Sequence, residues 1–561
     1  MKRKFHDHKN NIKLMKKQFL YTGFAIMLSL SATAQKNPDA VKFSETINKS
    51  RAYSHLSVIA SDEYEGRETG KKGAWMAAEY IKKQFQSFGL KGPVKDGGDP
   101  YFQKIGLITN DVSGAALSIN GKAKQLYKDF VIPSNSVSAT GLDINASEIV
   151  FAGYGITKEG YNDFDGINAE GKVVMIFSAG DPTAKAGEPA LTGRAAMMAR
   201  QKMMTGLMAA KPKAILLVDM NFDKVPEYSK IASTVGRIML KKDAPATAAP
   251  QRANPLVTIT ISPATANEIL KASNTTVEEL AKKIKDNVKP SSATVATTLA
   301  ATAKKVETPQ RGENVLGFLE GSDPKLKNEI LVLTGHYDHI GLNPDPNATD
   351  KVYNGADDDG SGTTGVLLMA EAFAKAKKAG KGPKRSILFM TVVGEEKGLL
   401  GSEWYSEHPV FPLANTIADL NTDMIGRIGE EYLGKADSAN YVYSVGSSML
   451  STELGQIQEQ INNTYTNLKL DFKYDDPKDT ERIYYRSDHY NFAKNNIPII
   501  FFYDGMLGKD YHGLGDEVSK INFDLLAKRA HLTYYIAWEL ANRANRPVVD
   551  KNQNGTPKTT N

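Results

Sequence analysis

The 561-residue sequence contains no cysteine. This absence excludes disulfide bonds, thiolate metal ligands and a lipid anchor attached to an N-terminal cysteine. Any metal ion that the protein binds must therefore be held by oxygen and imidazole ligands.

Long apolar runs are also absent. The most apolar stretch, residues 19–30, is shorter than the roughly 20 residues that a membrane-spanning helix needs. Seven Lys/Arg precede it, and an Ala-x-Ala sequence follows it and ends at Ala34. Residues 1–34 are therefore predicted to be a signal peptide that is cleaved after Ala34. We expect the mature protein to be exported, to the periplasm or the medium, and to have no membrane span.

The chain also lacks an excess of either positive or negative charge once this leader is removed. Residues 1–34 carry seven Lys/Arg and one Asp, which leaves 63 basic and 63 acidic residues in the remaining chain. A neutral chain of this kind lacks the basic surface typical of proteins that bind nucleic acid or anionic lipid. We therefore expect no nucleic-acid partner, and no motif indicates an oligomeric state.

The sequence pattern changes along the chain. Residues 44–89 have a helical pattern that ends at Gly89, whereas residues 112–308 contain short β-type runs separated by turn residues. The stretch 293–305 is either a returning strand or a linker. From residue 314 onward, apolar strands at 329–334, 386–393, 416–420, 441–445 and 497–503 alternate with helical patterns at 363–379, 448–462 and 523–545. This alternation predicts an α/β domain with a largely buried sheet.

Acidic residues, histidines and a tyrosine follow the strands of this domain. They are His336 and Asp338, Glu395 and Glu396, Asp423, and Tyr511 and His512, together with the acidic loop GADDDGSG at residues 355–362. Because ligands bind at the carboxyl ends of strands in such sheets, we expect these side chains to converge. Carboxylates gathered in this way repel one another, and a cation compensates them. Two imidazoles and three carboxylates suit a pair of zinc ions that share one carboxylate.

The residues of the acidic loop exclude other interpretations of it. The sequence GSGTTG at 360–365 matches a dinucleotide-binding pattern, but the three aspartates before it would repel a pyrophosphate. A calcium loop of the EF-hand type requires an acidic residue where Gly355 stands. A Walker loop requires a lysine where Ser361 stands.

Six motifs resemble, in order and spacing, those of the M28 family of co-catalytic zinc peptidases, which includes secreted aminopeptidases. They are GHYDHIG, GADDDGSG, VVGEEKGLLGS, NTDMIGR, YRSDHYNF and DYHGLGDE, at residues 335–341, 355–362, 392–402, 421–427, 485–492 and 510–517. The resemblance implies a three-layer α/β/α zinc peptidase domain with a mixed sheet. ASDEYEGRETG at residues 60–70 resembles the start of that domain, and the β-rich stretch resembles the protease-associated (PA) domain that some members carry as an insert.

The resemblance implies a domain organisation for the whole chain. After the signal peptide at 1–34, residues 35–111 form the N-terminal part of the peptidase domain, and residues 112–308 form the PA-like insert. Residues 309–545 form the main part of the peptidase domain, and residues 546–561 form a disordered tail.

The resemblance also assigns the metal ligands. His336 and Asp423 are expected to bind one zinc ion, and Glu396 and His512 the other. Asp358 is expected to bridge the two ions, with its neighbours Asp357 and Asp359 as the nearest alternatives. The remaining histidines, among them His339 and His489, are not at ligand positions of the family.

Further residues are expected to act on the substrate. Asp338 would accept a hydrogen bond from His336, and Glu395 would be the general base. Tyr511 is preferred over Tyr484 as the group that stabilises the oxyanion. Arg486 would bind substrate, although a surface ion pair explains this arginine equally well.

These residues predict an exported two-zinc aminopeptidase that acts on peptides, with Glu395 as its base. A carboxypeptidase or dipeptidase, or a glutaminyl cyclase with one zinc ion, are alternatives on the same fold. A receptor-like protein without enzymatic activity is a third alternative, but such a protein would have lost metal ligands, and all five ligand types are present here.

Overall fold

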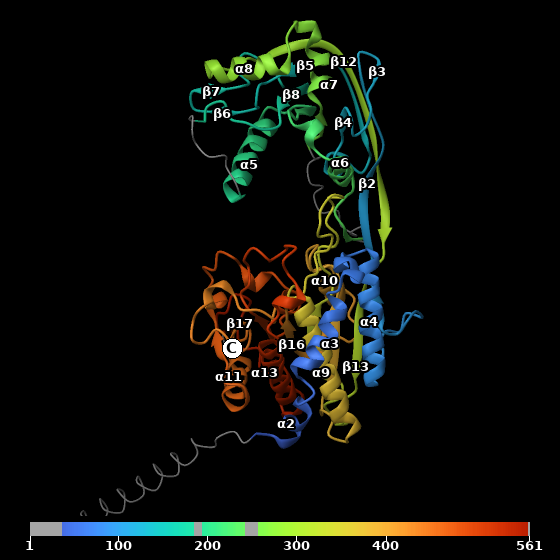
Figure 1. Cartoon of the computed structure of the whole chain (residues 1–561), viewed down its shortest axis with the longest axis vertical. Helices are drawn as coiled ribbons and strands as arrows, with labels where there is room; N and C mark the ends of the chain where they lie inside the picture. The colour runs from blue at the N-terminus through green and yellow to red at the C-terminus, as the bar shows by residue number, and fades with distance from the viewer. Residues whose placement is uncertain (1–35, 185–192, 242–255, 559–561) are drawn as a thin grey trace, which may run out of the picture. The chain divides into compact units, whose positions relative to one another are not determined.

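The structure is a computed structural model that describes residues 36–184, 193–241 and 256–558 (Figure 1). The predicted signal peptide lies outside these residues. The chain divides into two units. Unit 1 comprises residues 1–105, 312–342 and 352–561, and unit 2 comprises residues 106–311 and 343–351. Unit 2 is therefore inserted into unit 1 in sequence, and it includes the expected insert at 112–308.

Unit 1 is built on an eight-stranded mixed sheet. In spatial order its strands are β1 (Phe102–Lys104), β13 (Glu313–Leu319), β15 (Ser386–Val392), β14 (Ile330–His336), β16 (Thr416–Thr422), β19 (Ile499–Tyr503), β17 (Tyr441–Val445) and β18 (Lys469–Asp471). The four central strands are parallel, and β13 and β17 flank them in antiparallel orientation. The central strands are buried along their whole length, which explains why the sequence shows continuous apolar runs there rather than alternation.

Helices cover both faces of this sheet. They are α2 (Pro38–Ser44), α3 (Lys49–Ile59), α4 (Lys72–Phe88), α9 (Gly360–Lys378), α10 (Leu400–Glu407), α11 (Thr452–Tyr465), α12 (His489–Ala493) and α13 (Phe523–Asn542). On one face, Val332 of β14 belongs to a core cluster with Tyr405 of α10 and Phe492 of α12. On the other face, the ring of Phe373 in α9 lies 6.2 Å from the ring of Phe389 in β15. The expected α/β/α fold with a mixed sheet is confirmed.

Local signals explain where the elements near the acidic loop begin and end. The Asp359 side chain accepts a hydrogen bond from the Gly362 N–H at 2.8 Å and so caps the N-terminus of α9. Strand β14 continues two residues beyond its predicted end, because it pairs in register with β15 as far as His336 and Val392. His336 is therefore the last residue of a strand rather than part of the turn after it.

The C-terminal segment differs from the expected disordered tail. Residues 546–558 are ordered and contact the rest of unit 1. The Val548 N–H donates to Glu453 Oε2 at 3.0 Å, and Lys551 Nζ donates to the Ser448 carbonyl at 2.7 Å. These partners lie about 100 residues earlier in the chain, so a local sequence pattern could not indicate them.

Unit 2 contains a nine-stranded sheet. Its strands in spatial order are β10 (Met239–Leu240), β2 (Leu107–Ile119), β12 (Ala293–Gln310), β5 (Leu142–Phe151), β8 (Val173–Phe177), β9 (Ala214–Val218), β11 (Thr258–Ile261) and β4 (Phe130–Val131), and β3 (Lys122–Ala123) pairs with β2. Its helices are α5 (Gly193–Ala209), α6 (Glu227–Thr234), α7 (Pro263–Leu270) and α8 (Val277–Asn287). The stretch at 293–305 that was either strand or linker is a strand, β12, and it pairs with both β2 and β5.

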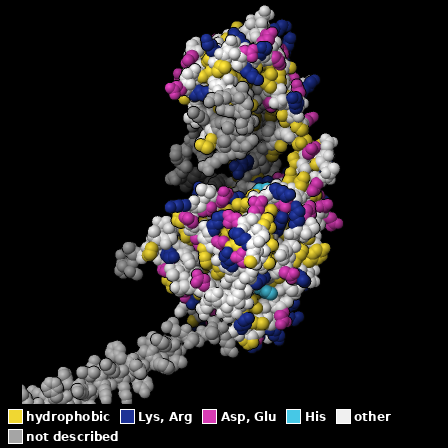
Figure 2. All heavy atoms as spheres, turned by 60° about the vertical axis from the view of Figure 1, so that its left-hand side comes forward, with side chains coloured by type: hydrophobic (Ala, Val, Ile, Leu, Met, Phe, Trp, Pro, Cys, Tyr) yellow, Lys and Arg dark blue, Asp and Glu magenta, His cyan; other side chains and the backbone are white. Residues whose placement is uncertain are grey.

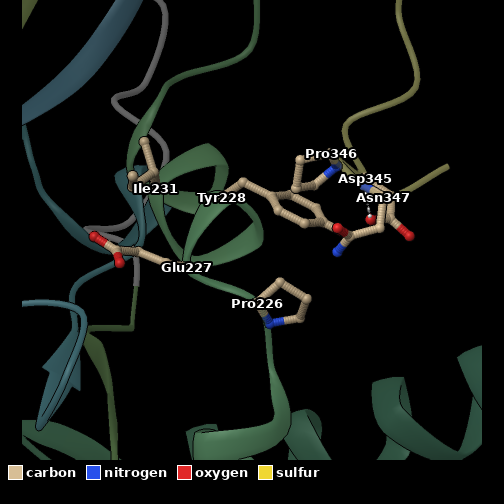
Figure 3. Close-up of a pocket in the computed structure, with 7 residues that line it drawn as sticks. All are labelled: Pro226, Glu227, Tyr228, Ile231, Asp345, Pro346 and Asn347. Atoms are coloured by element: carbon tan, nitrogen blue, oxygen red, sulfur yellow. Dashed lines mark hydrogen bonds between the residues drawn. The ribbon is translucent and has the colours of Figure 1, made fainter. Parts of the chain in front are cut away.

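Residues 343–351 belong to unit 2 although residues of unit 1 flank them in sequence. They face α6 across a surface hollow of about 550 Å³ (Figure 3). The hollow is lined by Pro226, Glu227, Tyr228, Ile231, Asp345, Pro346 and Asn347. The segment between His339 and Asp358 therefore begins and ends in unit 1, and its residues 343–351 belong to unit 2.

The described helices include none that is long and apolar enough to cross a membrane. On the face shown in Figure 2, Lys/Arg and Asp/Glu side chains are interspersed over unit 1. This distribution agrees with the balanced charge of residues 35–561.

Candidate metal centre

The carboxyl ends of β14, β15 and β16 bring the predicted donors together. His336 ends β14, Glu395 and Glu396 follow β15, and Asp423 follows β16. The acidic loop enters from the N-terminus of α9, which lies against these strands. Parallel strands end at the same edge of a sheet, so segments far apart in sequence meet there.

The first group of donors surrounds His336. The Nε2 atom of His336 lies 3.3 Å from Asp358 Oδ1, 3.6 Å from Asp423 Oδ1 and 3.8 Å from Glu395 Oε2. Tetrahedral coordination of zinc with bonds of about 2.0–2.1 Å separates neighbouring donor atoms by about 3.3 Å. The atoms of this group are therefore spaced as ligands of one ion are.

The second group of donors lies on the other side of Asp358. The Nε2 atom of His512 is 3.1 Å from Asp358 Oδ2 and 3.0 Å from Glu396 Oε2. Asp358 thus directs one oxygen to each group, which is the arrangement of a bridging carboxylate. The five expected ligands are brought together by the fold in two groups that share this residue.

The neighbours of Asp358 are engaged by backbone groups instead. The Asp359 carboxylate accepts the N–H groups of His336 at 3.0 Å and Met424 at 3.1 Å, in addition to capping α9. The Asp357 carboxylate accepts the Gly426 N–H at 2.8 Å. Of the three aspartates, Asp358 is the one whose two oxygens face imidazoles.

The electrostatics of the centre favour positive charge. Burial opposes protonation of His512, but its hydrogen bonds to Asp358 and Glu396 outweigh this effect and raise its pKa to about 10. Burial raises the pKa of the Glu395 carboxyl well above its ordinary value, and the nearby charges of Glu396 and Asp423 add to that shift. Both shifts favour a bound proton, and a divalent cation would supply the same positive charge.

Unpartnered atoms support the same conclusion. Within the described part of the chain, His336 Nε2 and Glu396 Oε1 are buried without a hydrogen-bond partner. Such atoms are costly to bury unless something else binds them. The imidazole and carboxylate donors of both groups therefore fit zinc, which accepts nitrogen and oxygen ligands.

Asp338 has a different role from the expected one. The Nδ1 atom of His336 is 3.0 Å from the backbone carbonyl of Asp338, whereas the nearer carboxylate oxygen is 3.7 Å away. The Asp338 carboxylate instead accepts hydrogen bonds from the Glu395 N–H at 3.2 Å and from Thr69 Oγ1 at 2.5 Å. Asp338 therefore orients His336 through its backbone and holds Glu395 in place through its side chain.

A hydrogen-bond chain supports Asp423. Ser487 Oγ donates to Asp423 Oδ2 at 2.6 Å, and Asn421 Nδ2 donates to Ser487 Oγ at 2.8 Å. The free oxygen of Asp423, Oδ1, is the one that faces His336. A carboxylate fixed in this way presents one oxygen to a metal ion in a defined direction.

Two residues that sequence reasoning missed hold the acidic loop. Asp516 accepts the N–H groups of Asp357 and Asp358. Arg67 is completely buried and donates to the carbonyls of Asn354 at 2.6 Å and Gly355 at 2.8 Å. Both residues lie in motifs that resembled the M28 family, but nothing in their residue type indicated the backbone groups that they bind.

A third residue that sequence reasoning missed is His339. Its Nδ1 atom lies 2.9 Å from Glu396 Oε1 and 3.9 Å from Asp358 Oδ2, within the second group of donors. The sequence feature that could have identified it is a second histidine only three residues after His336, in the sequence HYDH.

Of the residues expected to act on the substrate, two lie beside the second group of donors and one does not. The ring of Tyr511 stacks on that of His512 with centroids 4.0 Å apart, and Arg486 Nη2 donates to the Tyr511 hydroxyl at 3.1 Å. Tyr484 is buried, and among the described residues its ring contacts Tyr485, His489 and Tyr490 rather than a metal donor. Tyr511 and Arg486 thus adjoin the second group, and Tyr484 does not.

Comparisons with known proteins point to one family. Residues 314–537 match the model of peptidase family M28. A "Probable leucine aminopeptidase" of Arthroderma otae is 30% identical over 246 residues, which cover 43% of this chain and 61% of that protein. A "Probable glutamate carboxypeptidase" of Arthroderma benhamiae is 32% identical over 112 residues, which cover 20% of this chain and 14% of that protein.

Solved structures were found as well. A zinc aminopeptidase from Bacillus subtilis is 18% identical, with a TM-score of 0.48 over 90% of this chain and 97% of that one. An aminopeptidase from Aneurinibacillus sp. strain AM-1 is 16% identical, with a TM-score of 0.48 over 91% of this chain and 98% of that one.

The chain spans 61% of the length of the Arthroderma otae relative and 56% of the length of two further leucine aminopeptidase relatives. The matched region, residues 314–537, contains every donor of both groups. In this region, the chain is similar to peptidase family M28.

Proposed function

We propose that the protein is an exported metallo-aminopeptidase that removes N-terminal residues from peptides with the help of two zinc ions. The observation that carries this proposal is that the two oxygens of Asp358 face two separate groups of imidazoles and carboxylates. The names of the relatives, leucine aminopeptidases and a zinc metalloprotease, agree with it.

The groups around the metal positions suit hydrolysis of a peptide bond. Zinc ions bound here would supply Lewis acidity and lower the pKa of a water molecule. The Glu395 carboxylate, held by Asp338 and beside His336, accepts a proton from the attacking water and returns it to the leaving amine.

Tyr511 is placed to stabilise the developing oxyanion. Its hydroxyl accepts a hydrogen bond from Arg486 and so remains free to donate its own proton to a substrate oxygen. The stacking of its ring on His512 fixes the direction of that hydroxyl. Arg486 would in this way assist catalysis by orienting Tyr511, in addition to any direct contact with substrate.

The direct test is the substitution Glu395→Gln. We expect hydrolysis of leucine p-nitroanilide to fall by about 100- to 10,000-fold, because a positioned general base contributes a factor of this size. Zinc content, measured by elemental analysis, should remain at two ions per chain. Glu407→Gln, at the exposed end of α10, is the matched control and should keep full activity. Full activity of the Glu395 variant would refute the proposal for the base.

Substrate and metal analysis separate the alternatives. An aminopeptidase should cleave leucine p-nitroanilide but not its N-acetyl derivative, whereas a carboxypeptidase would cleave an N-acetylated dipeptide with a free carboxylate. A glutaminyl cyclase would contain one zinc ion per chain. The two donor groups favour two ions.

Export is tested by fractionating cells that express the whole gene. We expect the activity outside the cytoplasm and a mature N-terminus at Gln35. A cytoplasmic protein that retains residues 1–34 would contradict this part of the proposal. The similarity of unit 2 to a PA domain is likewise a proposal.

A further inference from the structure

Asn491 is a buried asparagine in the short helix α12, and it contacts the turn that follows the proposed base. Its amide nitrogen Nδ2 donates to the Leu399 carbonyl at 3.1 Å and to Ser402 Oγ at 2.7 Å. An amide nitrogen carries two hydrogens, so both bonds can form at once. Asn491 therefore joins α12 to the turn between β15 and α10.

That turn is folded onto the backbone of Glu395. The Glu395 carbonyl accepts the N–H groups of Gly398 at 2.8 Å and Leu399 at 3.0 Å. Leu399 thus accepts a hydrogen bond from Asn491 through its carbonyl and donates one to Glu395 through its N–H. Two hydrogen bonds through a single residue connect α12 to the backbone of the base.

Leu399 has a backbone conformation that needs support from outside the turn. Its φ of 62° and ψ of 32° lie in the left-handed region, which a leucine rarely adopts. Such a conformation persists when the surrounding contacts hold it. Ser402 Oγ lies 3.2 Å from the Leu399 carbonyl, but its one hydrogen has a closer acceptor in Asp488 Oδ1 at 2.6 Å. Asn491 is therefore the side chain that holds the Leu399 carbonyl.

The turn carries both Glu395 and Glu396, and the two carboxylates depend on it to different degrees. Glu396 lies 3.0 Å from His512 Nε2 and is expected to be held by a metal ion as well. Glu395, as the base, binds no metal, so protein contacts alone fix its place. A change in the turn should therefore displace Glu395 more than Glu396.

We propose that Asn491 is a positioning residue for the reaction, which holds Glu395 in reach of the attacking water by fixing Leu399. This inference rests on the proposed function, because it takes Glu395 as the base. Displacing a reacting group by about 1 Å can lower a rate by about 100-fold. The loss of Asn491 should accordingly appear in kcat, and substrate binding should change little.

Two substitutions of Asn491 test this in the full-length protein. Asn491→Ala and Asn491→Leu both remove the two donors, and leucine has nearly the volume of asparagine, so it leaves no large cavity. With leucine p-nitroanilide and saturating zinc, we expect kcat to fall about 10- to 100-fold in both variants. KM should stay within about twofold, and zinc content should stay at two ions per chain.

The matched control is Asn495→Ala, at an exposed residue just after α12. Its Nδ2 donates to the Asn491 backbone carbonyl at 2.8 Å and does not contact Leu399. This variant loses a hydrogen bond to the same helix and should keep full kcat. If Asn491→Ala does not fold, Asn491→Leu provides the same test without the cavity.

Hydrogen exchange gives a second measurement that does not depend on catalysis. We expect the N–H groups of Gly398 and Leu399 to exchange at least about tenfold faster in Asn491→Leu than in the unaltered protein, because the turn opens more often. A kcat within about threefold of the unaltered value, loss of zinc at saturating zinc, or unchanged exchange at these positions would overturn the inference. An unaltered protein that does not cleave leucine p-nitroanilide would refute the proposed function, and the exchange rates would still decide whether Asn491 holds the turn.

Discussion

The carboxylate of Asp516 accepts the backbone N–H of Asp358 at 3.0 Å. The same carboxylate also accepts the N–H of Asp357. Asp516 lies four residues after His512 in the chain, so it joins the loop that carries one donor of the second group to the loop that carries the shared donor, Asp358. The separation of these two donors is thereby fixed through the backbone.

We predict that Asp516→Ala weakens zinc binding. The substitution removes the acceptor for two buried N–H groups and frees the acidic loop, and such supporting residues contribute about 10- to 100-fold to metal affinity. Competition with a chelator measures the effect. Asp524→Ala, at an exposed aspartate near the start of α13, is the control and should bind zinc normally. Unchanged affinity of the Asp516 variant would show that the loop keeps its shape without this acceptor.

Removing the metal should lower the thermal stability of unit 1. Ions bound to the folded state stabilise it by about 2.7 kcal/mol when free zinc is at 100 times its dissociation constant. Addition of EDTA should therefore lower the melting temperature by several degrees, and added zinc should restore it. Differential scanning calorimetry with and without chelator tests this. A melting temperature that does not respond to chelator would contradict metal binding at this centre.

The buried histidine His55 should make the protein sensitive to acid. It lies in α3 with Nδ1 2.9 Å from the Tyr80 hydroxyl, and burial together with the charge of Arg51 lowers its pKa to about 4. Below about pH 6.5 the unfolded chain binds a proton that the folded chain refuses. The free energy of unfolding should therefore fall as the pH drops from 6.5 to 4, by about 3 kcal/mol from this residue.

The matched variant for this prediction is His55→Gln, which cannot take up the proton. Urea unfolding at pH 7.5 and 4.5 should show a pH dependence that is smaller by about 2–3 kcal/mol in the variant. An equal pH dependence in both proteins would mean that His55 does not contribute to the acid sensitivity.

In unit 2, Asp163 should be important for stability and unimportant for metal binding. Its buried carboxylate accepts the N–H groups of Tyr154 and Ile156 at 3.0 Å and the Tyr161 hydroxyl at 2.8 Å. Asp163→Ala leaves these donors unpaired, so we expect unit 2 to lose roughly 3 kcal/mol of stability. Urea unfolding measures this loss, and elemental analysis should still find two zinc ions. Asp165→Ala, at an exposed neighbour, should be close to neutral.

The sequence predicted the parts of the fold that depend on local patterns. The strand at 441–445 was predicted with the observed bounds, and α9, α11 and α13 were predicted within a few residues, because burial of whole strands and helical periodicity are visible in short windows. The short helices α10 and α12 were not predicted. The five expected ligands are acidic or imidazole side chains that follow strands or lie in the acidic loop, and chemistry of that kind is also visible in the sequence.

The rest of the site depends on contacts between distant segments. The hydrogen bonds of Asp516 and the ring of His339 depend on where two loops meet, and no window of sequence contains both. The side chain of Asp338 was misassigned for the same reason. Its partner Thr69 lies 269 residues earlier in the chain, beyond the reach of any local pattern.

The contacts of Arg67 bear on how the protein is made. This arginine donates a hydrogen bond to the carbonyl of Asn354, 287 residues further along the chain, so the contact forms only after the ribosome has synthesised all of unit 2. The residues that match the family model start at 314 and lack this arginine. A gene fragment trimmed to that region would therefore encode the expected metal ligands but not the arginine that holds the loop carrying Asp358.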